Sequence, residues 1–185
     1  MNDIVKSAWA SVKMNTDFIC VDTYSGYRSN QLDPLGVQHL SSPDVSDLDL
    51  GEMVKDALSH SRFVLPAPRT DIWIHPEVTF DLDLYDSRRT VERYDEWVKK
   101  LMVHYGYKTK RALFKDMKSC DICCNHDAIT ISPTRHEKLE VWGGTGLKGS
   151  DNVILSVDSS PTEIGAGLRL ALSRCKGLEH HHHHH

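Results

Sequence analysis

The sequence lacks the long apolar runs that would place it in or across a membrane. No stretch approaches the roughly 18 to 20 consecutive apolar residues that span a bilayer, and the opening Met-Asn-Asp-Ile-Val-Lys contains no apolar run of signal-peptide length. We therefore expect a cytosolic protein without membrane contacts. The five cysteines are an odd number in a chain of 185 residues, which argues against a disulfide framework and favours free thiols.

Strong charge of either sign is also absent. Residues 178–185 consist of Leu-Glu and six histidines and look like an expression tag, so the expected single domain comprises residues 1–177. Removing Glu179 from the 26 acidic residues leaves 25, against 22 basic ones, for a net charge of −3. This balance argues against nucleic-acid binding driven by bulk positive charge. The length suits one domain with its own core.

Catalytic motifs with a defined mechanism are missing as well. The chain has no Walker sequence, no G-x-S-x-G and no H-E-x-x-H. Gly144 to Gly149 match GxGxxG, but nucleotide binding needs a helix directly after this motif to receive the pyrophosphate. Here Ser150-Asp-Asn leads into a predicted strand. We interpret the motif as a glycine-rich hairpin loop rather than a nucleotide site.

The best-defined element lies near the carboxyl end. Ser160 suits the N-cap of a helix, Pro161 the first helical position, and Glu163 the reciprocal bond of a capping box. Apolar residues then recur at three- and four-residue spacing, which predicts an amphipathic helix lying on a sheet. Gly165 and Gly167 each cost roughly 1 kcal/mol inside a helix, so they indicate close backbone approach by a neighbour.

A segment 114 residues upstream repeats this pattern. The stretches Leu50-Gly51, Val54-Lys55 and Ala57-Leu58-Ser59 correspond to Ile164-Gly165, Leu168-Arg169 and Ala171-Leu172-Ser173. We interpret them as two helices that solve the same packing problem, in preference to a duplication, because a repeat architecture needs at least three copies. Ser46 can cap the upstream helix, which is expected from Asp47 to about Arg62.

The rest of the chain predicts several strands with helices between and after them. Residues 8–24 have the pattern of a β-hairpin, residues 27–44 that of an ordered loop, and residues 91–105 that of a helix ended by Gly106. A short helix is expected within residues 107–118, and further strands at 71–75, 78–86, 121–124, 128–132, 138–142 and 153–157. This order predicts an α+β fold, a single domain with a mainly antiparallel sheet packed by three or four helices.

One predicted strand carries clustered carboxylates. In residues 78–86 the period of two would place Phe80, Leu82 and Leu84 on one face, opposite Asp81, Asp83 and Tyr85. The acidic face has three interpretations: a solvated surface, a surface that docks on a cationic partner, or a carboxylate pair about 7 Å apart that holds the metal of a hydrolase. The third is disfavoured because no paired histidine or general base accompanies the pair.

A second candidate metal site combines thiols and imidazoles. Its members are Cys120, Cys123, Cys124 and His126, with His136 further along. They could supply enough ligands for zinc, but a strand would turn Cys123 away from the other two cysteines. We therefore favour buried thiols with surface histidines, and expect no metal and no cofactor. The basic run 108–118 is likewise interpreted as a solvated amphipathic segment rather than a phosphate-binding one.

Several stretches taken together resemble the immunity proteins of bacterial contact-dependent growth inhibition (CDI), of the CdiI type. They are residues 24–28, 58–62, 94–97, 105–115, 131–136 and 164–175. The resemblance covers most of the domain and implies a cytosolic, non-catalytic inhibitor that binds the nuclease domain at the end of its own strain's cell-surface toxin. It carries over no catalytic residue, and no contact residue either, because each immunity protein is specific for its own toxin.

The main hypothesis is a tight heterodimer with this nuclease toxin domain and no direct contact with nucleic acid. A nuclease presents cationic groups to phosphate, so carboxylates placed opposite them would speed association and block the active site or the substrate path. Exposed strand edges could add main-chain pairing. The expected contact residues are Tyr24, Tyr27, Asp81, Asp83 and Tyr85. The alternative is a metal-dependent hydrolase that uses Asp81 and Asp83 with a histidine from among His75, His126 and His136.

Overall fold

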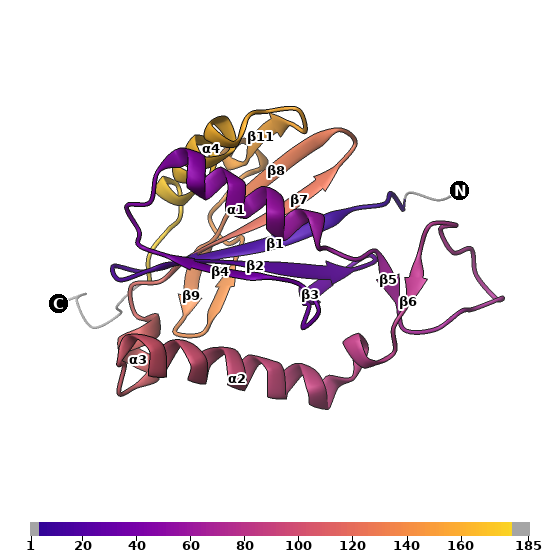
Figure 1. Cartoon of the computed structure of the whole chain (residues 1–185), viewed down its shortest axis with the longest axis horizontal. Helices are drawn as coiled ribbons and strands as arrows, with labels where there is room; N and C mark the ends of the chain where they lie inside the picture. The colour runs from indigo at the N-terminus through magenta and orange to yellow at the C-terminus, as the bar shows by residue number, and fades with distance from the viewer. Residues whose placement is uncertain (1–3, 179–185) are drawn as a thin grey trace.

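The chain folds around one seven-stranded antiparallel sheet with helices on both faces (Figure 1). The structure, a computed structural model, describes residues 4–178, so all of the expected tag but its first residue lies outside the described part. The strand order is β11–β8–β7–β1–β2–β3, and β4 also pairs with β2. These strands are β1 (Ala8–Met14), β2 (Ile19–Gly26), β3 (Asn30–Leu32), β4 (Gln38–Ser41), β7 (Lys118–Asn125), β8 (Ala128–Pro133) and β11 (Val153–Ser156).

This architecture confirms the predicted α+β fold and corrects several segments, of which residues 27–44 are the first. Strands β1 and β2 form the hairpin expected for residues 8–24. The expected loop at 27–44 instead contains β3 and β4, which lie along opposite halves of β2, a strand of eight residues. These short strands are separated by a turn with Pro34 and Gly36, so neither is long enough to show a period of two in the sequence.

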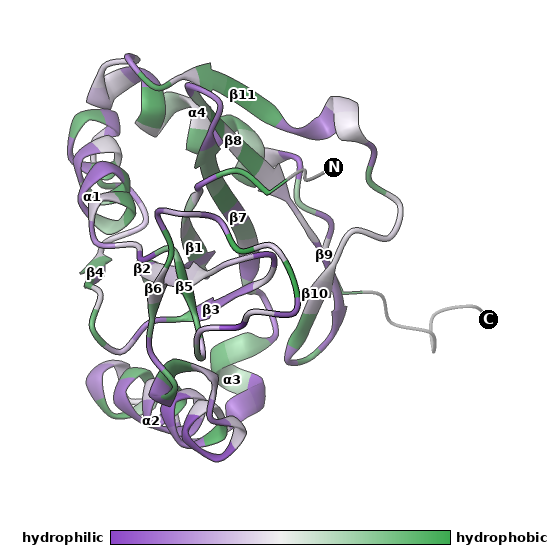
Figure 2. Ribbon diagram, turned by 90° about the vertical axis from the view of Figure 1, so that its right-hand side faces the viewer, coloured by the Kyte–Doolittle hydropathy of each residue, from purple (hydrophilic) through white to green (hydrophobic). Residues whose placement is uncertain are grey.

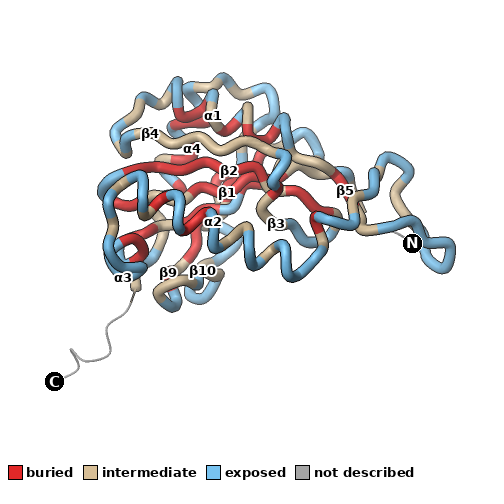
Figure 3. Tube along the Cα trace, turned by 60° about the horizontal axis from the view of Figure 1, so that its bottom comes forward, coloured by how far each residue is buried: buried red, intermediate tan, exposed pale blue. Residues whose placement is uncertain are grey.

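Helices α1 (Asp47–Ser59) and α4 (Pro161–Ser173) cover the first face of the sheet. Both begin as predicted, because the Ser46 hydroxyl accepts the Asp49 N–H, and Ser160 and Glu163 form a complete capping box. Figure 3 shows how their inward sides and the central strands are buried while their outer sides face solvent. None of the helices within residues 4–178 is long and apolar enough to cross a membrane.

The repeated glycine pattern is explained by direct contact between these two helices. A Cβ atom added at Gly51 would lie 1.7 Å from the carbonyl oxygen of Pro161, the first residue of α4. One added at Gly165 would lie 1.9 Å from the carbonyl oxygen of Asp47, the first residue of α1. Each helix therefore uses a glycine to admit the amino end of the other. The close approach was predicted from the sequence, but the two helices were not predicted to be each other's neighbours.

The second face of the sheet is covered by α2 (Ser87–Tyr105), α3 (Lys110–Phe114) and the hairpin of β9 (Arg135–Lys138) and β10 (Val141–Gly143). Helix α2 begins four residues before the predicted start because the Asp86 carboxylate accepts the backbone N–H groups of the first turn. It ends as predicted at Gly106, whose φ is 73°. Figure 2 shows apolar strands of the sheet between the two layers of helices.

The segment between β4 and α2 differs most from its prediction. Residues 71–75 are not a strand, and residues 78–86 form only β6 (Thr79–Phe80), which pairs in parallel with β5 (Val64–Leu65). A 3₁₀ turn, η1 (Asp83–Tyr85), follows, so the expected alternation is wrong: Leu84 is buried whereas Leu82 is 70% exposed. The backbone conformation of this segment depends on side-chain contacts with residues distant in the sequence. Such contacts leave no local pattern from which they could be predicted.

The GxGxxG stretch connects β10 to β11, which belong to different sheets. It is followed by a three-residue 3₁₀ turn, η2 (Gly149–Asp151), and then by β11. The expected hairpin is therefore wrong, while the predicted strand does follow. A helix end able to receive a pyrophosphate is absent at this place in the chain.

Candidate partner-binding surface

A groove lies on the second face of the sheet, beside α2. Two adjoining cavities of about 240 and 310 Å³ share Lys13, Tyr24 and Tyr94 and together form one trough. We call this trough the central groove and define it by Ser11, Lys13, Tyr24, Tyr94, Asp121 and Trp142. Its floor is the sheet, one wall is α2, and the other wall is the β9–β10 hairpin.

The groove exists because two central strands are apolar on one side only. In β1, Ala10 and Val12 enter the core beneath α1 and α4, so Ser11 and Lys13 point to the opposite face. In β7 the same alternation brings Asp121 to the groove. Asp121 pairs directly with Ser11 in the β1–β7 register. The sheet therefore presents a polar floor where α2 and the hairpin do not meet.

Lys13 is the cation of the groove floor. Its Nζ donates to Ser11 Oγ at 3.0 Å and lies 6.0 Å from the ring centre of Trp97 and 5.5 Å from that of Trp142. Both rings stabilise the ammonium through their π faces. This lysine is therefore held by neighbours of its own chain.

A buried carboxylate lies behind the lysine. Asp22 accepts hydrogen bonds from Trp97 Nε1 at 3.0 Å, Gln38 Nε2 at 2.9 Å and Cys20 Sγ at 3.1 Å. Burial raises its pKa, and these hydrogen bonds oppose the rise only in part. The network fixes the Trp97 ring against the sheet, which gives α2 its position over β2.

The wall of the groove is formed by an aromatic side chain bonded to a carboxylate. Tyr94 of α2 donates its hydroxyl to Glu140 Oε1 at 2.6 Å, which links the helix to the β9–β10 turn. Lys110 of α3 lies 3.6 Å from the same oxygen. Burial, followed by the bond to Glu140, raises the pKa of Tyr94. At the floor, burial likewise raises the pKa of Tyr24.

Asp121 is the carboxylate of the groove floor that is free to bind a group from a partner. Its carboxylate takes part in no hydrogen bond or ion pair within residues 4–178, and it is exposed to solvent in the groove. Crowding by protein atoms raises its pKa, and the charge of Lys13 opposes this rise. Asp121, Glu140 and Trp142 were not among the candidates predicted from the sequence. The only signal was a charged residue within an otherwise apolar strand.

The structure separates the two tyrosines expected to contact a partner. Tyr24 lines the central groove. Tyr27 lies past the end of β2, where its ring stacks on Phe63 with ring centres 5.0 Å apart and its hydroxyl accepts the His75 N–H at 3.0 Å. Tyr27 therefore anchors the segment that carries β5 and β6.

The three other expected contacts lie around that segment, and their charges are paired. Asp81 accepts from Arg62 Nη1 at 2.8 Å, and this bond lowers its pKa. Asp83 accepts from Arg89 Nε at 3.1 Å and pairs with a second arginine of α2, Arg93. The Tyr85 hydroxyl donates to the Val64 carbonyl oxygen at 2.5 Å. These residues do not form the unpaired acidic strand face that was expected.

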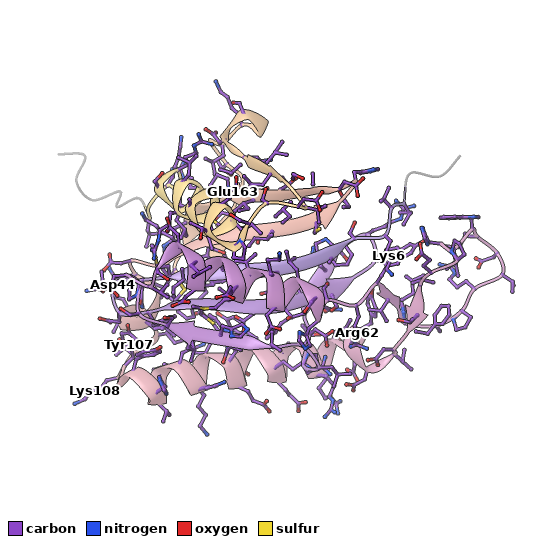
Figure 4. All side chains as sticks on the ribbon, turned by 45° about the horizontal axis from the view of Figure 1, so that its top comes forward. Lys6, Asp44, Arg62, Tyr107, Lys108 and Glu163 are labelled. Carbon is purple, nitrogen blue, oxygen red and sulfur yellow. The ribbon has the colours of Figure 1, made fainter. Side chains whose placement is uncertain are left out.

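Arg62 connects this segment to the sheet (Figure 4). Its Nε donates to Asp33 Oδ2 at 2.7 Å and its Nη2 to Asp33 Oδ1 at 2.9 Å, while Nη1 binds Asp81. The Ser25 hydroxyl donates to the same Asp33 at 2.6 Å. Asp81 thus binds an arginine, and Asp83 binds two others, which is not the arrangement of a shared metal site.

The cysteines and histidines considered for zinc are also dispersed. Cys120 and Cys124 contact the core beneath α1 and α4, and Cys123 points to the other face, as the strand geometry predicted. His136 is buried, where Nε2 donates to the Leu139 carbonyl oxygen and the ring stacks on Trp142, so it is not a surface residue. Among residues 4–178 no three side chains of the ligating types are grouped closely enough to hold a metal ion.

Comparison with known proteins assigns the chain to a family. A model of the CDI immunity protein (CdiI) family matches residues 8–175. The chain belongs to the CDI immunity protein family. A solved structure of a Neisseria meningitidis protein of unknown function, NMB0488, shares 41% sequence identity with it, at a TM-score of 0.78. The match covers 95% of this chain and 99% of the other. For a CDI immunity protein, the partner is the cognate CDI toxin, and a partner-binding surface is the functional site to look for.

Proposed function

We propose that this immunity protein neutralises a nuclease toxin domain by binding it as a heterodimer in the cytoplasm and covering its active site or the path of its nucleic-acid substrate. The protein performs no reaction itself. The observation that carries the proposal is the family match over residues 8–175, almost the whole described chain. The paired states of Asp81 and Asp83 support inhibition over the hydrolase alternative, because both carboxylates are bound by arginines.

Charge supports a nuclease as the partner. Helix α1 turns its carboxylates Asp49 and Glu52 to solvent on the first face, and Asp121 and Glu140 lie at the central groove on the second. Cationic groups that a nuclease uses for phosphate are attracted by carboxylates, and the carboxylates of the groove lie beside the proposed contact Tyr24. Tyr24, Tyr27, Asp81, Asp83 and Tyr85 remain the proposed contacts, with Tyr24 alone among them placed in the groove.

An exposed apolar cluster supports a protein partner. Ile72, Trp73, Phe80 and Leu82, from the segment that carries β6, are 53%, 51%, 44% and 70% exposed. This segment extends from the end of the sheet (Figure 1). Large apolar side chains gathered on one exposed segment are typical of contact surfaces, and Trp73 is of the residue type most often found at interface hot spots.

Titration of the toxin's activity tests the proposal. The cognate toxin domain is mixed with labelled DNA and RNA, and the immunity protein is added in steps. We expect cleavage of one substrate to stop at one equivalent, with a one-to-one complex on size-exclusion chromatography. Cleavage that continues at a tenfold excess of inhibitor would reject the proposal. The same protein incubated with divalent metal and phosphoesters should show no turnover.

A further inference from the structure

We propose that the central groove is the site at which the immunity protein receives a basic side chain of the toxin, with Asp121 as the carboxylate that binds it. This inference rests on the proposed function and identifies the surface and the chemistry of the contact. The charged groups around the groove differ in whether they already have a partner.

The other charged groups at the central groove already have partners. Lys13 is bound by Ser11 and lies against two indole rings, and Glu140 accepts the Tyr94 hydroxyl. Asp22 is buried and receives three hydrogen bonds. Asp121 differs, because none of the residues from 4 to 178 binds its carboxylate. Burial raises its pKa, and a cation beside the carboxylate would oppose this rise by stabilising the charged form.

The walls of the groove suit a cation, and a guanidinium best. The ring of Tyr94 lines the α2 wall, and a planar guanidinium can stack on such a ring while binding a carboxylate through two N–H groups. Glu140 at the rim is paired with Lys110 and accepts the Tyr94 hydroxyl, and Ser119 and Thr134 add hydroxyl groups. Asp121 is therefore the carboxylate in this part of the groove that has no hydrogen-bonding or ionic partner among residues 4–178.

A basic side chain of a nuclease would meet this charge with little reorganisation. The α2 wall is fixed by the Trp97–Asp22 bond and the hairpin wall by the bond of Trp142 Nε1 to the Met117 carbonyl oxygen at 3.0 Å. The groove is therefore formed before the partner arrives, and binding restricts few side chains of this protein. If the inserted side chain is one that holds phosphate in the toxin, its capture would also block nucleic acid.

The test compares two pairs of variants in toxin binding measured by surface plasmon resonance. Asp121→Asn removes the charge at the groove, and Glu52→Gln removes one from the exposed side of α1 on the other face of the sheet. Val141→Arg adds a cation at the rim, where Val141 is 45% exposed, and Ile154→Arg adds one on the edge strand β11 at a residue that is 67% exposed. Thermal unfolding of each variant shows that it is folded.

We expect Asp121→Asn to weaken toxin binding on the order of 100-fold, mainly through faster dissociation, and Val141→Arg to weaken it at least as much. Glu52→Gln and Ile154→Arg should bind within about threefold of the unchanged protein, as expected of charges outside the contact. Wild-type affinity in both groove variants would overturn the groove as the site while leaving the inhibitor function in place. Loss of affinity in Glu52→Gln alone would assign docking to α1. Failure of the unchanged protein to bind the toxin would overturn both proposals.

Discussion

Gly51 and Gly165 occupy equivalent positions in α1 and α4, and each lies against the first residue of the other helix. The arrangement is reciprocal: Gly51 meets the carbonyl group of Pro161, and Gly165 meets that of Asp47. A similar sequence pattern therefore recurs because two helices share one contact. Their close packing leaves room for both on the first face of the sheet, above the core that contains Leu50, Ile164 and Leu168.

Replacing Gly165 by Ala should destabilise the protein despite the better helix propensity of alanine. The propensity gain is about 1 kcal/mol, but the new Cβ would lie 1.9 Å from a backbone oxygen that cannot move without α1. We expect a net loss of about 2 kcal/mol or more in the free energy of unfolding, measured by urea denaturation. Gly144→Ala is the control, since its Cβ would meet nothing within 4 Å. A Gly165→Ala variant as stable as the parent would contradict this packing.

Replacing Arg62 by Met should also be costly, because it leaves the buried Asp33 carboxylate without its cation. The Asp33 side chain is 0% exposed and that of Arg62 is 26% exposed. Removal of one partner from a buried pair costs about 3 to 5 kcal/mol, and we expect the lower end because Arg62 reaches solvent. The exposed Arg69, paired with Asp71, provides the control: Arg69→Met should leave the urea midpoint unchanged.

The same pair predicts a dependence of stability on pH. Burial alone would raise the pKa of Asp33, but bonds from Arg62, Ser25 and the Leu35 N–H outweigh it, and the pKa is lowered. A lowered carboxyl pKa stabilises the fold above the unfolded value, about 3.9, and this stabilisation disappears as the pH falls through the lower folded value. Without Arg62 the pKa should be raised, so acidification should relieve the penalty. The stability gap between parent and Arg62→Met should therefore shrink as the pH falls toward about 3.9, where the variant loses its penalty, and shrink further below it, where the parent loses its stabilisation; a constant gap would refute the assignment.

Cys175 should be the most rapidly alkylated of the five cysteines. Its Sγ lies 3.6 Å from that of Cys120, and the hydrogen bond from Cys120 lowers the pKa of Cys175 to about 7, whereas the pKa of Cys120 is raised. Iodoacetamide at pH 7 followed by peptide mass spectrometry should label Cys175 first, because the thiolate is the nucleophile. Cys124 is the comparison, since it is similarly half-buried but burial raises its pKa. Cys120→Ala should slow labelling of Cys175; faster labelling of Cys124 would be the contrary result.

Tyr27→Phe should loosen the segment that carries the exposed Trp73 without changing the core. The variant keeps the ring that stacks on Phe63 but loses the oxygen that accepts the His75 N–H. Hydrogen–deuterium exchange at the His75 amide should then become on the order of tenfold faster, since a hydrogen bond typically contributes about 1 kcal/mol. Amides of α1 should exchange at the parent's rate, and an unchanged His75 amide would show that this bond does not hold the segment.

Local patterns in the sequence determined the helices and most strands. The capping box at Ser160, the glycine after α2 and the apolar periods of α1, α2 and α4 each depend on neighbours within a few residues, so their physical causes are visible in the sequence. The match to immunity proteins came from the sequence as well. Short strands such as β3, β4 and β5 were missed because two to four residues cannot display a period.

What lies at the candidate site was decided by tertiary structure. Asp81 and Asp83 looked alike as unpaired carboxylates of one strand, but their arginine partners lie 19, 6 and 10 residues away, and only the fold brings them together. Asp121 looked like any charged residue of a strand, yet the fold leaves it unbound on the floor of a groove with aromatic walls. Sequence fixes which side of a strand a residue faces. Whether that side meets a partner, a solvent-filled groove or the core depends on elements brought together from the whole chain.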